Sequence, residues 1–201
     1  MIQSNKCVTV RKLNKSFVNA AGDRVRAVAD LSLTMYQDEC FCLLGHNGAG
    51  KTTTMMMITG CMTQSSGQIK VKGCKIPEQV RETRTSMGFC PQHNVLFNEL
   101  TVNEHLELFG SLGGMAPEHL RKRGNELVNA VALSDKRETR AAALSGGMKR
   151  KLSAALAFLS EPYLVILDEP SSGMDPFARR GMWNTLKQWR TGHIPYLVIL
   201  D

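Results

Sequence analysis

The chain has 201 residues and a mass of 22.2 kDa, which is enough for one domain with a packed core. Its composition, 43% hydrophobic and 21% charged, excludes a disordered chain. The net charge of +7 favours anionic ligands, but no nucleic-acid-binding motif accompanies the basic clusters at 121–123 and 149–151. We therefore interpret those clusters as solvated or phosphate-attracting surface and expect no nucleic acid partner.

The apolar runs in the sequence are all shorter than the roughly eighteen residues that a bilayer span needs. Residues 1–15 lack the continuous apolar stretch of a secretory signal. The six cysteines include no C-x-x-C pair, although Cys40 and Cys42 would share one face of a strand. We expect a chain without a membrane span, with reduced thiols, that is made and kept in the cytosol.

The N-terminal part of the chain is predicted to form β structure and then a strand, a loop and a helix. Short β-like stretches at 7–10 and 26–36 flank polar turn residues at 21–23, which predicts an antiparallel sheet. The apolar segment Cys40–Leu44 leads directly into a glycine-rich loop, and residues 51–59 are typical of a helix.

The middle of the chain changes from strands to helices. Residues 68–72 alternate like a half-buried strand, and residues 86–90 are predicted to form another. Thr101 and Glu104 have the spacing of a capping box before an apolar-periodic stretch. We expect residues from about 98 to 160 to be mainly helical.

A second apolar segment follows the helices. Residues 163–167 form a continuous apolar run, which is typical of a parallel strand buried on both faces. Residues 175–190 are predicted to be a helix whose core-facing stripe holds Trp183, Leu186 and Trp189.

The glycine-rich loop fits the Walker A pattern G-x-x-x-x-G-K-[ST], between a predicted strand and a predicted helix as its mechanism requires. In such a loop, backbone N–H groups and the helix N-terminus face phosphate oxygens. Lys51 would neutralise the β- and γ-phosphates of ATP, and Thr52 is suited to bind Mg²⁺. The predicted nucleotide-binding residues are Gly45, His46, Asn47, Gly48, Ala49, Gly50, Lys51, Thr52 and Thr53.

Two adjacent acids end the second apolar run. Asp168 is suited to hold Mg²⁺ through water, and Glu169 to activate the water that attacks the γ-phosphate. Two solvated acids after a strand are the alternative, but the upstream loop favours the catalytic interpretation. A general base contributes about 10²–10⁴-fold, so a Glu169→Gln chain should bind ATP and hydrolyse it poorly.

The segment Leu144–Met148 precedes an alanine- and leucine-rich helix that Ser145 would cap. With the loop and the two acids, this segment resembles the signature of ATP-binding cassette (ABC) ATPases. The longer stretch 144–156 and the phrase Gly-His-Asn-Gly-Ala-Gly-Lys at 45–51 resemble the A subfamily, the lipid-exporter branch. Methionine at the position of Met148 is usual in that subfamily.

The resemblance implies further roles. In that family the signature of one cassette closes over the γ-phosphate held by another, which implies dimerisation and a role in trans for Ser145, Gly146 and Gly147. Gln92 would be the Q-loop glutamine that touches Mg²⁺ and relays nucleotide state to membrane domains, with a plain polar loop residue as the alternative. Asp175 matches the D-loop that couples the two sites.

Two other features fit the family less closely. Phe17 resembles the aromatic residue that stacks on adenine, although a core role is equally compatible. The family's switch histidine would fall near Leu200, where no histidine stands, and His193 lies too early to replace it.

The end of the sequence departs from the family. Residues 195–201 repeat residues 162–168 letter for letter. The chain is then either a truncated or misjoined product that lacks its true tail, which we favour, or a short form in which the repeated strand fills the vacant sheet position. Because the switch histidine is missing, we expect Mg·ATP binding with slow hydrolysis by the isolated chain.

As a whole the sequence predicts an α/β fold: a P-loop NTPase (RecA-like) core, an N-terminal antiparallel β subdomain and an inserted α-helical subdomain, in one nucleotide-binding domain over 7–201. The resemblance implies ATP and Mg²⁺ as cofactors and an ATPase that drives transmembrane transport, with a lipid as candidate cargo. The implied partners are a second cassette and the transmembrane domains of a transporter, at the cytoplasmic face of a membrane. The alternatives are a hydrolysis-deficient nucleotide-binding or regulatory fragment, and a soluble ABC protein acting on ribosomes or nucleic acid, which the lack of a tandem second cassette disfavours.

Overall fold

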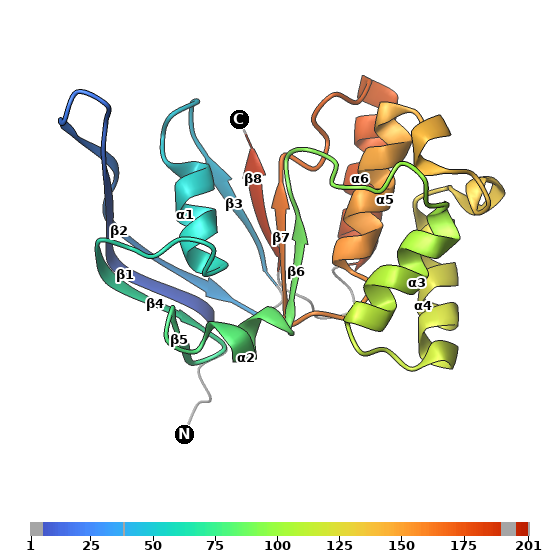
Figure 1. The fold of residues 1–201 in the computed structure, drawn as a ribbon, viewed down its shortest axis with the longest axis horizontal. Coiled ribbons are helices and arrows are strands. Elements are labelled where there is room, and N and C mark those ends of the chain that lie inside the picture. The colour runs from blue at the N-terminus through green and yellow to red at the C-terminus, as the bar shows by residue number, and fades with distance from the viewer. Residues whose placement is uncertain (1–5, 38, 190–195, 201) are drawn as a thin grey trace.

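The N-terminal strands pair in an antiparallel sheet, as predicted. In a computed structural model that describes residues 6–37, 39–189 and 196–200, this sheet has the strand order β2-β1-β4-β5 (Figure 1). Its strands are β1 (Lys6–Val18), β2 (Arg24–Tyr36), β4 (Ser66–Val71) and β5 (Cys74–Ile76). The sheet is larger than predicted, because β1 continues to Val18 and β5 adds an edge strand.

A second sheet is parallel and carries the predicted central strands. In the order β3-β8-β7-β6, they are β3 (Cys40–Leu44), β8 (Tyr196–Leu200), β7 (Leu164–Asp168) and β6 (Met87–Cys90). β8 comes from the repeated segment and lies between β3 and β7, with Leu200 paired to Leu44 and Tyr196 paired to Val165. The repeated strand therefore occupies an interior position in the sheet. His193, Pro195 and Asp201 lie outside the described residues.

The strand β7 separates two hydrophobic cores. Leu164 and Ile166 belong to one core, with the inner face of the antiparallel sheet and α1 (Lys51–Ile58), which lies between the two sheets (Figure 1). Val165 and Leu167 belong to the other core, which the helices complete. A strand covered on both faces has apolar residues at every position, which explains its unbroken apolar run.

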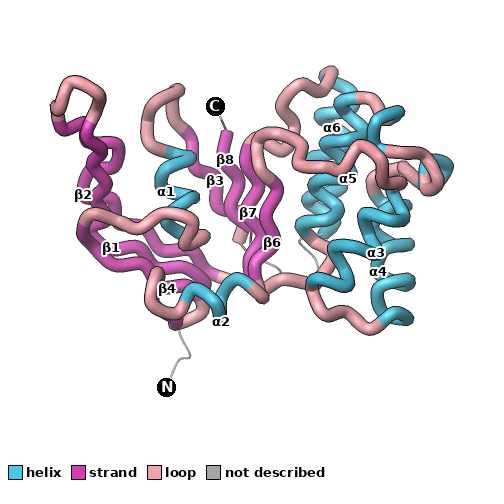
Figure 2. Tube along the Cα trace, in the orientation of Figure 1, coloured by secondary structure: helices cyan, strands magenta, loops and turns pink. Residues whose placement is uncertain are grey.

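Apart from α1, the longer helices gather on one side of the parallel sheet (Figure 2). They are α3 (Val102–Leu112), α4 (Pro117–Ala130), α5 (Gly146–Ala157) and α6 (Pro176–Trp189), while the short α2 (Val80–Arg84) precedes β6. The predicted capping box is confirmed: Glu104 N–H donates to Thr101 Oγ1 over 3.2 Å, and Thr101 N–H donates to Glu104 Oε2 over 2.7 Å. Within the described part of the chain, no helix is long and apolar enough to cross a membrane.

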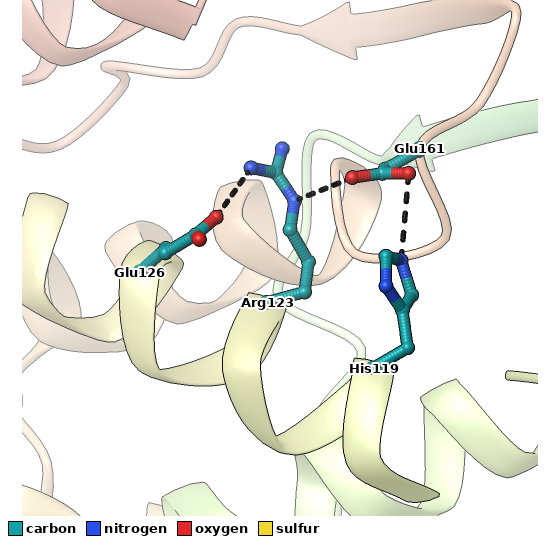
Figure 3. A network of polar contacts seen from close by, with 4 residues as sticks. All are labelled: His119, Arg123, Glu126 and Glu161. Carbon is teal, nitrogen blue, oxygen red and sulfur yellow. Dashed lines mark hydrogen bonds and ion pairs between the residues drawn. The ribbon is translucent and has the colours of Figure 1, made fainter. Parts of the chain in front are cut away.

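A small ionic network connects α4 to the turn before β7 (Figure 3). Glu161 contacts His119 Nε2 at 3.4 Å and Arg123 Nε at 3.8 Å, and Arg123 Nη1 also donates to Glu126 over 3.2 Å. The carboxylates are half exposed, so solvent screens these pairs and each stabilises the fold by at most about 1 kcal/mol. The network therefore contributes little to the stability of the fold.

Candidate nucleotide-binding site

The glycine-rich loop connects β3 to α1 and requires glycine at its last position. Gly50 is the N-cap of α1 with a φ of 85°, and a Cβ on it would lie 2.3 Å from the carbonyl oxygen of Ala27. Both the left-handed backbone and the close approach therefore exclude a side chain there. No side chain caps α1. The N–H groups of its first turn and its partial positive charge are the features that hold a phosphate.

Lys51 begins α1 and bends back over the loop. Its side chain is buried, and its Nζ donates to the carbonyl oxygens of Gly45 and His46, the latter over 3.1 Å. The ammonium group is thus held at the loop itself, where the phosphates of a nucleotide would lie. Thr52, the next residue, is exposed.

A cleft of about 180 Å³ opens above the loop. It brings together residues that lie far apart in the sequence. The loop follows β3, Gln92 follows β6 and Glu169 follows β7, and these parallel strands end at the same edge of the sheet. Its lining residues are Ala27, Asn47, Gly48, Ala49, Gly50, Lys51, Thr52, Thr53, Gln92 and Glu169. Gln92 Nε2 donates to Glu169 Oε1 over 2.9 Å, so the predicted Q-loop glutamine and general base are in direct contact.

The two acids after β7 have different environments. Asp168 ends the strand and is only 3% exposed. Glu169 is half-buried, lines the cleft and has a left-handed φ of 45°. A non-glycine residue in that conformation costs about 1–2 kcal/mol and persists because its surroundings hold it. The turn from β7 therefore separates the two carboxylates, as their predicted roles require.

Arg150 of α5 is the residue that holds this turn, and its burial differs from the prediction for its segment. The basic cluster at 149–151 was predicted to be solvated or phosphate-attracting surface, but Arg150 is 2% exposed. Its guanidinium donates to the carbonyl oxygens of Pro91, Asp168 and Glu169, the last over 2.8 Å. One buried side chain thus joins α5 to both segments that supply Gln92 and Glu169.

The thiol of Cys90, which lies near Arg150, does not neutralise the charge of the guanidinium. Burial raises the pKa of Cys90 to about 11, with Arg150 opposing and Asp168 adding to the shift. The thiol is therefore uncharged at neutral pH, and carbonyl oxygens are the main partners of the guanidinium. One feature of the sequence indicates that Arg150 is buried: it shares a helix face with the small residues Ser153, Ala154 and Ala157, which are also buried.

Several predicted residues lie outside this cleft. Phe17 is 39% exposed, with Lys15 Nζ 5.1 Å from its ring centroid, and it does not line the cleft. Ser145 accepts a hydrogen bond from Met148 N–H over 3.3 Å and caps α5, as predicted. Asp175 Oδ1 accepts from the N–H groups of Phe177 and Ala178 at the start of α6. The signature and D-loop residues are therefore at helix starts and not within this chain's own cleft.

The oxygen ligands at the cleft suit a magnesium ion that binds together with the nucleotide. Thr52 and Gln92, which line the cleft, and Asp168, which precedes Glu169 and does not itself line it, offer hard oxygen ligands, which Mg²⁺ prefers. Among the described residues, no group of three or more His, Cys, Asp or Glu side chains could hold a metal by itself. Phosphate oxygens and water would have to complete the coordination, which is how Mg²⁺ binds in nucleotide sites.

The parallel sheet, the loop and the cleft define a P-loop nucleotide-binding cassette. More specifically, the chain belongs to the ABC transporter family, whose model matches residues 28–172. The predicted family and its A subfamily are confirmed by relatives. The chain is 45% identical to "ATP-binding cassette sub-family A member 2" of Rattus norvegicus over 92% of its own length and 8% of that protein. It is 40% identical to "Phospholipid-transporting ATPase ABCA3" of Homo sapiens over 92% of its length and 11% of that protein.

A solved structure confirms the predicted fold class. "Structure of ATP binding subunit of ABC transporter" matches with a TM-score of 0.85 at 28% identity, over 97% of this chain and 79% of that one. The chain thus has the fold of an ABC ATPase cassette. It spans about a tenth of the length of the curated relatives it matches.

Proposed function

We propose that the chain binds Mg·ATP in the cleft above its glycine-rich loop and hydrolyses the bond between the β- and γ-phosphates, which releases ADP and phosphate. The observation that carries this proposal is the shared cleft, which the loop, Gln92 and Glu169 line together. The loop N–H groups and Lys51 bind the phosphates, and Thr52, Gln92 and Asp168 would hold Mg²⁺. The metal, when bound, neutralises charge on the β- and γ-phosphate oxygens.

Glu169 is the general base in this proposal. Its carboxylate accepts a proton from the water that attacks the γ-phosphorus, the bond from that phosphorus to the bridging β-phosphate oxygen breaks, and ADP leaves. The amide of Gln92 orients the carboxylate through the bond of 2.9 Å. Arg150 fixes the backbone of Glu169 by binding its carbonyl oxygen. Phosphoryl transfer depends mainly on positioning and charge stabilisation, which these contacts supply.

A second cassette completes the site through the signature at the start of α5. Gly146 and Gly147 have ordinary backbone conformations, and a Cβ on either would meet nothing within 4 Å. Glycine within a helix costs up to about 1 kcal/mol relative to alanine, so neither position needs glycine for the fold of this chain. Glycine at these two positions would instead let a phosphate held by another cassette approach the backbone closely. Asp175, at the neighbouring helix start, would couple the two sites.

The transport role rests on family membership. In ABC transporters an ATPase cassette works with transmembrane domains, so we place this chain at the cytoplasmic face of a membrane with such domains as partners. The name of the relative "Phospholipid-transporting ATPase ABCA3" supports a lipid as the cargo.

A second candidate function is nucleotide binding with little turnover, as in a regulatory module. One observation favours it: β8 runs between β3 and β7 and ends with Leu200 paired to Leu44, directly before the loop. The sequence of this strand, Tyr196–Leu200, brings no imidazole to that end of the sheet. The described strand therefore offers no side chain for the γ-phosphate contact that the resemblance implies near Leu200.

The substitution Glu169→Gln tests the proposal, with Glu161→Gln as the matched control, because Glu161 lies in an exposed turn away from the cleft. The affinity for Mg·ATP should stay within about threefold, and turnover should fall by about 10²–10⁴-fold in Glu169→Gln alone. Equal turnover in Glu169→Gln and the unmodified chain would remove the assignment of the base. If that equal turnover were also indistinguishable from buffer while ATP still bound, the second candidate would replace the first.

A further inference from the structure

The outer face of the antiparallel sheet carries a concentration of basic residues that the nucleotide site does not use. Val8 and Val10 of β1 are buried against the core and pair with Val71 and Ile69 of β4. Successive side chains of a strand alternate between faces, so the residues between them point outward. Those residues include Thr9, which pairs with Lys70, and Arg11, which pairs with Gln68.

These outward residues line a hollow of about 460 Å³. Its positive groups are Lys6, Arg11, Lys70 and Lys72, and hydroxyls are supplied by Thr9 and Tyr163. No carboxylate is among its lining residues in the described part of the chain. Arg11 and Lys70 are diagonal neighbours on adjacent strands, about 7–8 Å apart at the backbone, so both side chains reach one ligand.

The positive charges on this face of the antiparallel sheet repel one another. Lys70 lies directly opposite Lys75 of β5, and like charges in that position destabilise a strand pair. Among the described residues no carboxylate lies within ion-pair distance of Arg11, Lys70, Lys72 or Lys75, although surface acids pair with basic residues elsewhere. A bound anion would relieve this repulsion.

One edge of the hollow is built from ordered contacts. Lys72 Nζ lies 4.9 Å from the ring centroid of Tyr163, and Lys72 N–H donates to the carbonyl oxygen of Cys7 over 2.9 Å. Tyr163 Oη accepts from Gln37 Nε2 over 3.2 Å. Burial raises the pKa of Cys7 to about 12, so its thiol brings no negative charge to the hollow.

We propose that this hollow is a second anion site, which binds a compact organic polyphosphate with at least two phosphate groups. It shares no lining residue with the cleft above the glycine-rich loop. Arginine and lysine side chains with neighbouring hydroxyls match phosphate oxygens, and the number of cations around one hollow exceeds what a single phosphate needs.

The shape and charge favour a compact ligand over an extended one. The neighbouring hollow on the same face shares Arg11 and Gln68 with this one and adds Lys12, but it also holds the carboxylate of Asp30, which this hollow lacks. A polyanion that extended along the sheet would meet that negative charge. A compact polyphosphate stays within the basic hollow.

Calorimetric titration with inositol hexakisphosphate in metal-free buffer tests the proposal. Every chain would carry Lys51→Ala, so that the glycine-rich loop contributes little to anion binding. The test variant is Arg11→Gln with Lys70→Gln. The control is Arg121→Gln with Lys122→Gln, which removes the same two kinds of charge from an exposed part of α4.

We expect one molecule bound per chain, a dissociation constant at least about tenfold higher in the test variant and within twofold in the control, and weaker binding at high salt. Equal weakening in both variants, or no saturable binding, would overturn the proposal. Binding of single-stranded RNA or of vesicles containing phosphatidylserine without binding of the hexakisphosphate would also overturn it. None of these outcomes depends on ATP hydrolysis, so the proposed function stands or falls separately.

Discussion

Replacement of Arg150 should damage both folding and turnover, because one guanidinium connects α5 with the segments that carry Gln92 and Glu169. In Arg150→Ala, the carbonyl oxygens of Pro91, Asp168 and Glu169 lose their donor. Hydrogen bonds to charged groups contribute about 1.5–3 kcal/mol each, but removing Arg150 also removes the cost of burying its charge. We expect a net loss of about 3 kcal/mol.

That loss corresponds to a fall in Tm of about 6–12 °C, since a chain of this size shifts by about 2–4 °C per kcal/mol. Arg150→Lys keeps the charge but not the planar fork, so it should retain one contact and lose about 2 kcal/mol. Lys149→Ala, one residue earlier on α5, is the matched control and should melt within about 2 °C of the unmodified chain. Calorimetric melting measures all three.

Measurements of turnover separate the effect of Arg150 on catalysis from its effect on stability. At a temperature where both chains are folded, Arg150→Lys should lower kcat more than the affinity for ATP, because the backbone of Glu169 loses the contact that holds its left-handed conformation. A Tm unchanged in Arg150→Ala, or a variant that differs from Lys149→Ala in neither Tm nor kcat, would refute this reasoning.

Two further predictions follow from helix starts. Gly147→Ala should raise the free energy of unfolding of the isolated chain in urea by up to about 1 kcal/mol, because a Cβ at this position has no atom within 4 Å. The same substitution should lower ATP turnover at concentrations where cassettes pair. A lower free energy of unfolding would contradict the absence of close neighbours around Gly147. The capping-box hydrogen bond from Thr101 N–H lowers the pKa of Glu104, so its contribution to stability is present above the unfolded pKa and is lost as pH falls through the folded value. Glu104→Gln should therefore flatten the fall of the urea midpoint between pH 6 and 3, and an identical pH profile would remove this role.

The sequence predicts best what depends on local pattern. The glycine-rich loop, the capping box at Thr101 and the apolar run of β7 are each specified within a few residues, and the structure has all three. The contact between Gln92 and Glu169 was not predicted, because it links residues 77 positions apart. The resemblance implied only that Gln92 touches Mg²⁺ and relays nucleotide state.

What the sequence did not predict depends on contacts between distant segments. Arg150 stands among basic neighbours, which predict surface. In the structure it is buried and donates to the carbonyl oxygens of Pro91, which follows β6, and of Asp168, which ends β7, 59 and 18 residues away. The basic hollow is similarly invisible, because Arg11 and Lys70 become neighbours only through the register of β1 with β4. Phe17 was predicted to stack on adenine, and that role stays a prediction since the residue does not line the cleft.

The most direct test of the account is the stoichiometry and affinity of Mg·ATP binding, measured by calorimetry for the unmodified chain and for Lys51→Ala, with Lys122→Ala as control. We predict one site per chain, with affinity lower by about 10–100-fold in Lys51→Ala and unchanged in the control, as expected for loss of a charged contact of about 1.5–3 kcal/mol. Absence of binding in the unmodified chain, or equal affinity in the Lys51→Ala chain, would contradict the assignment of this cleft as the nucleotide site.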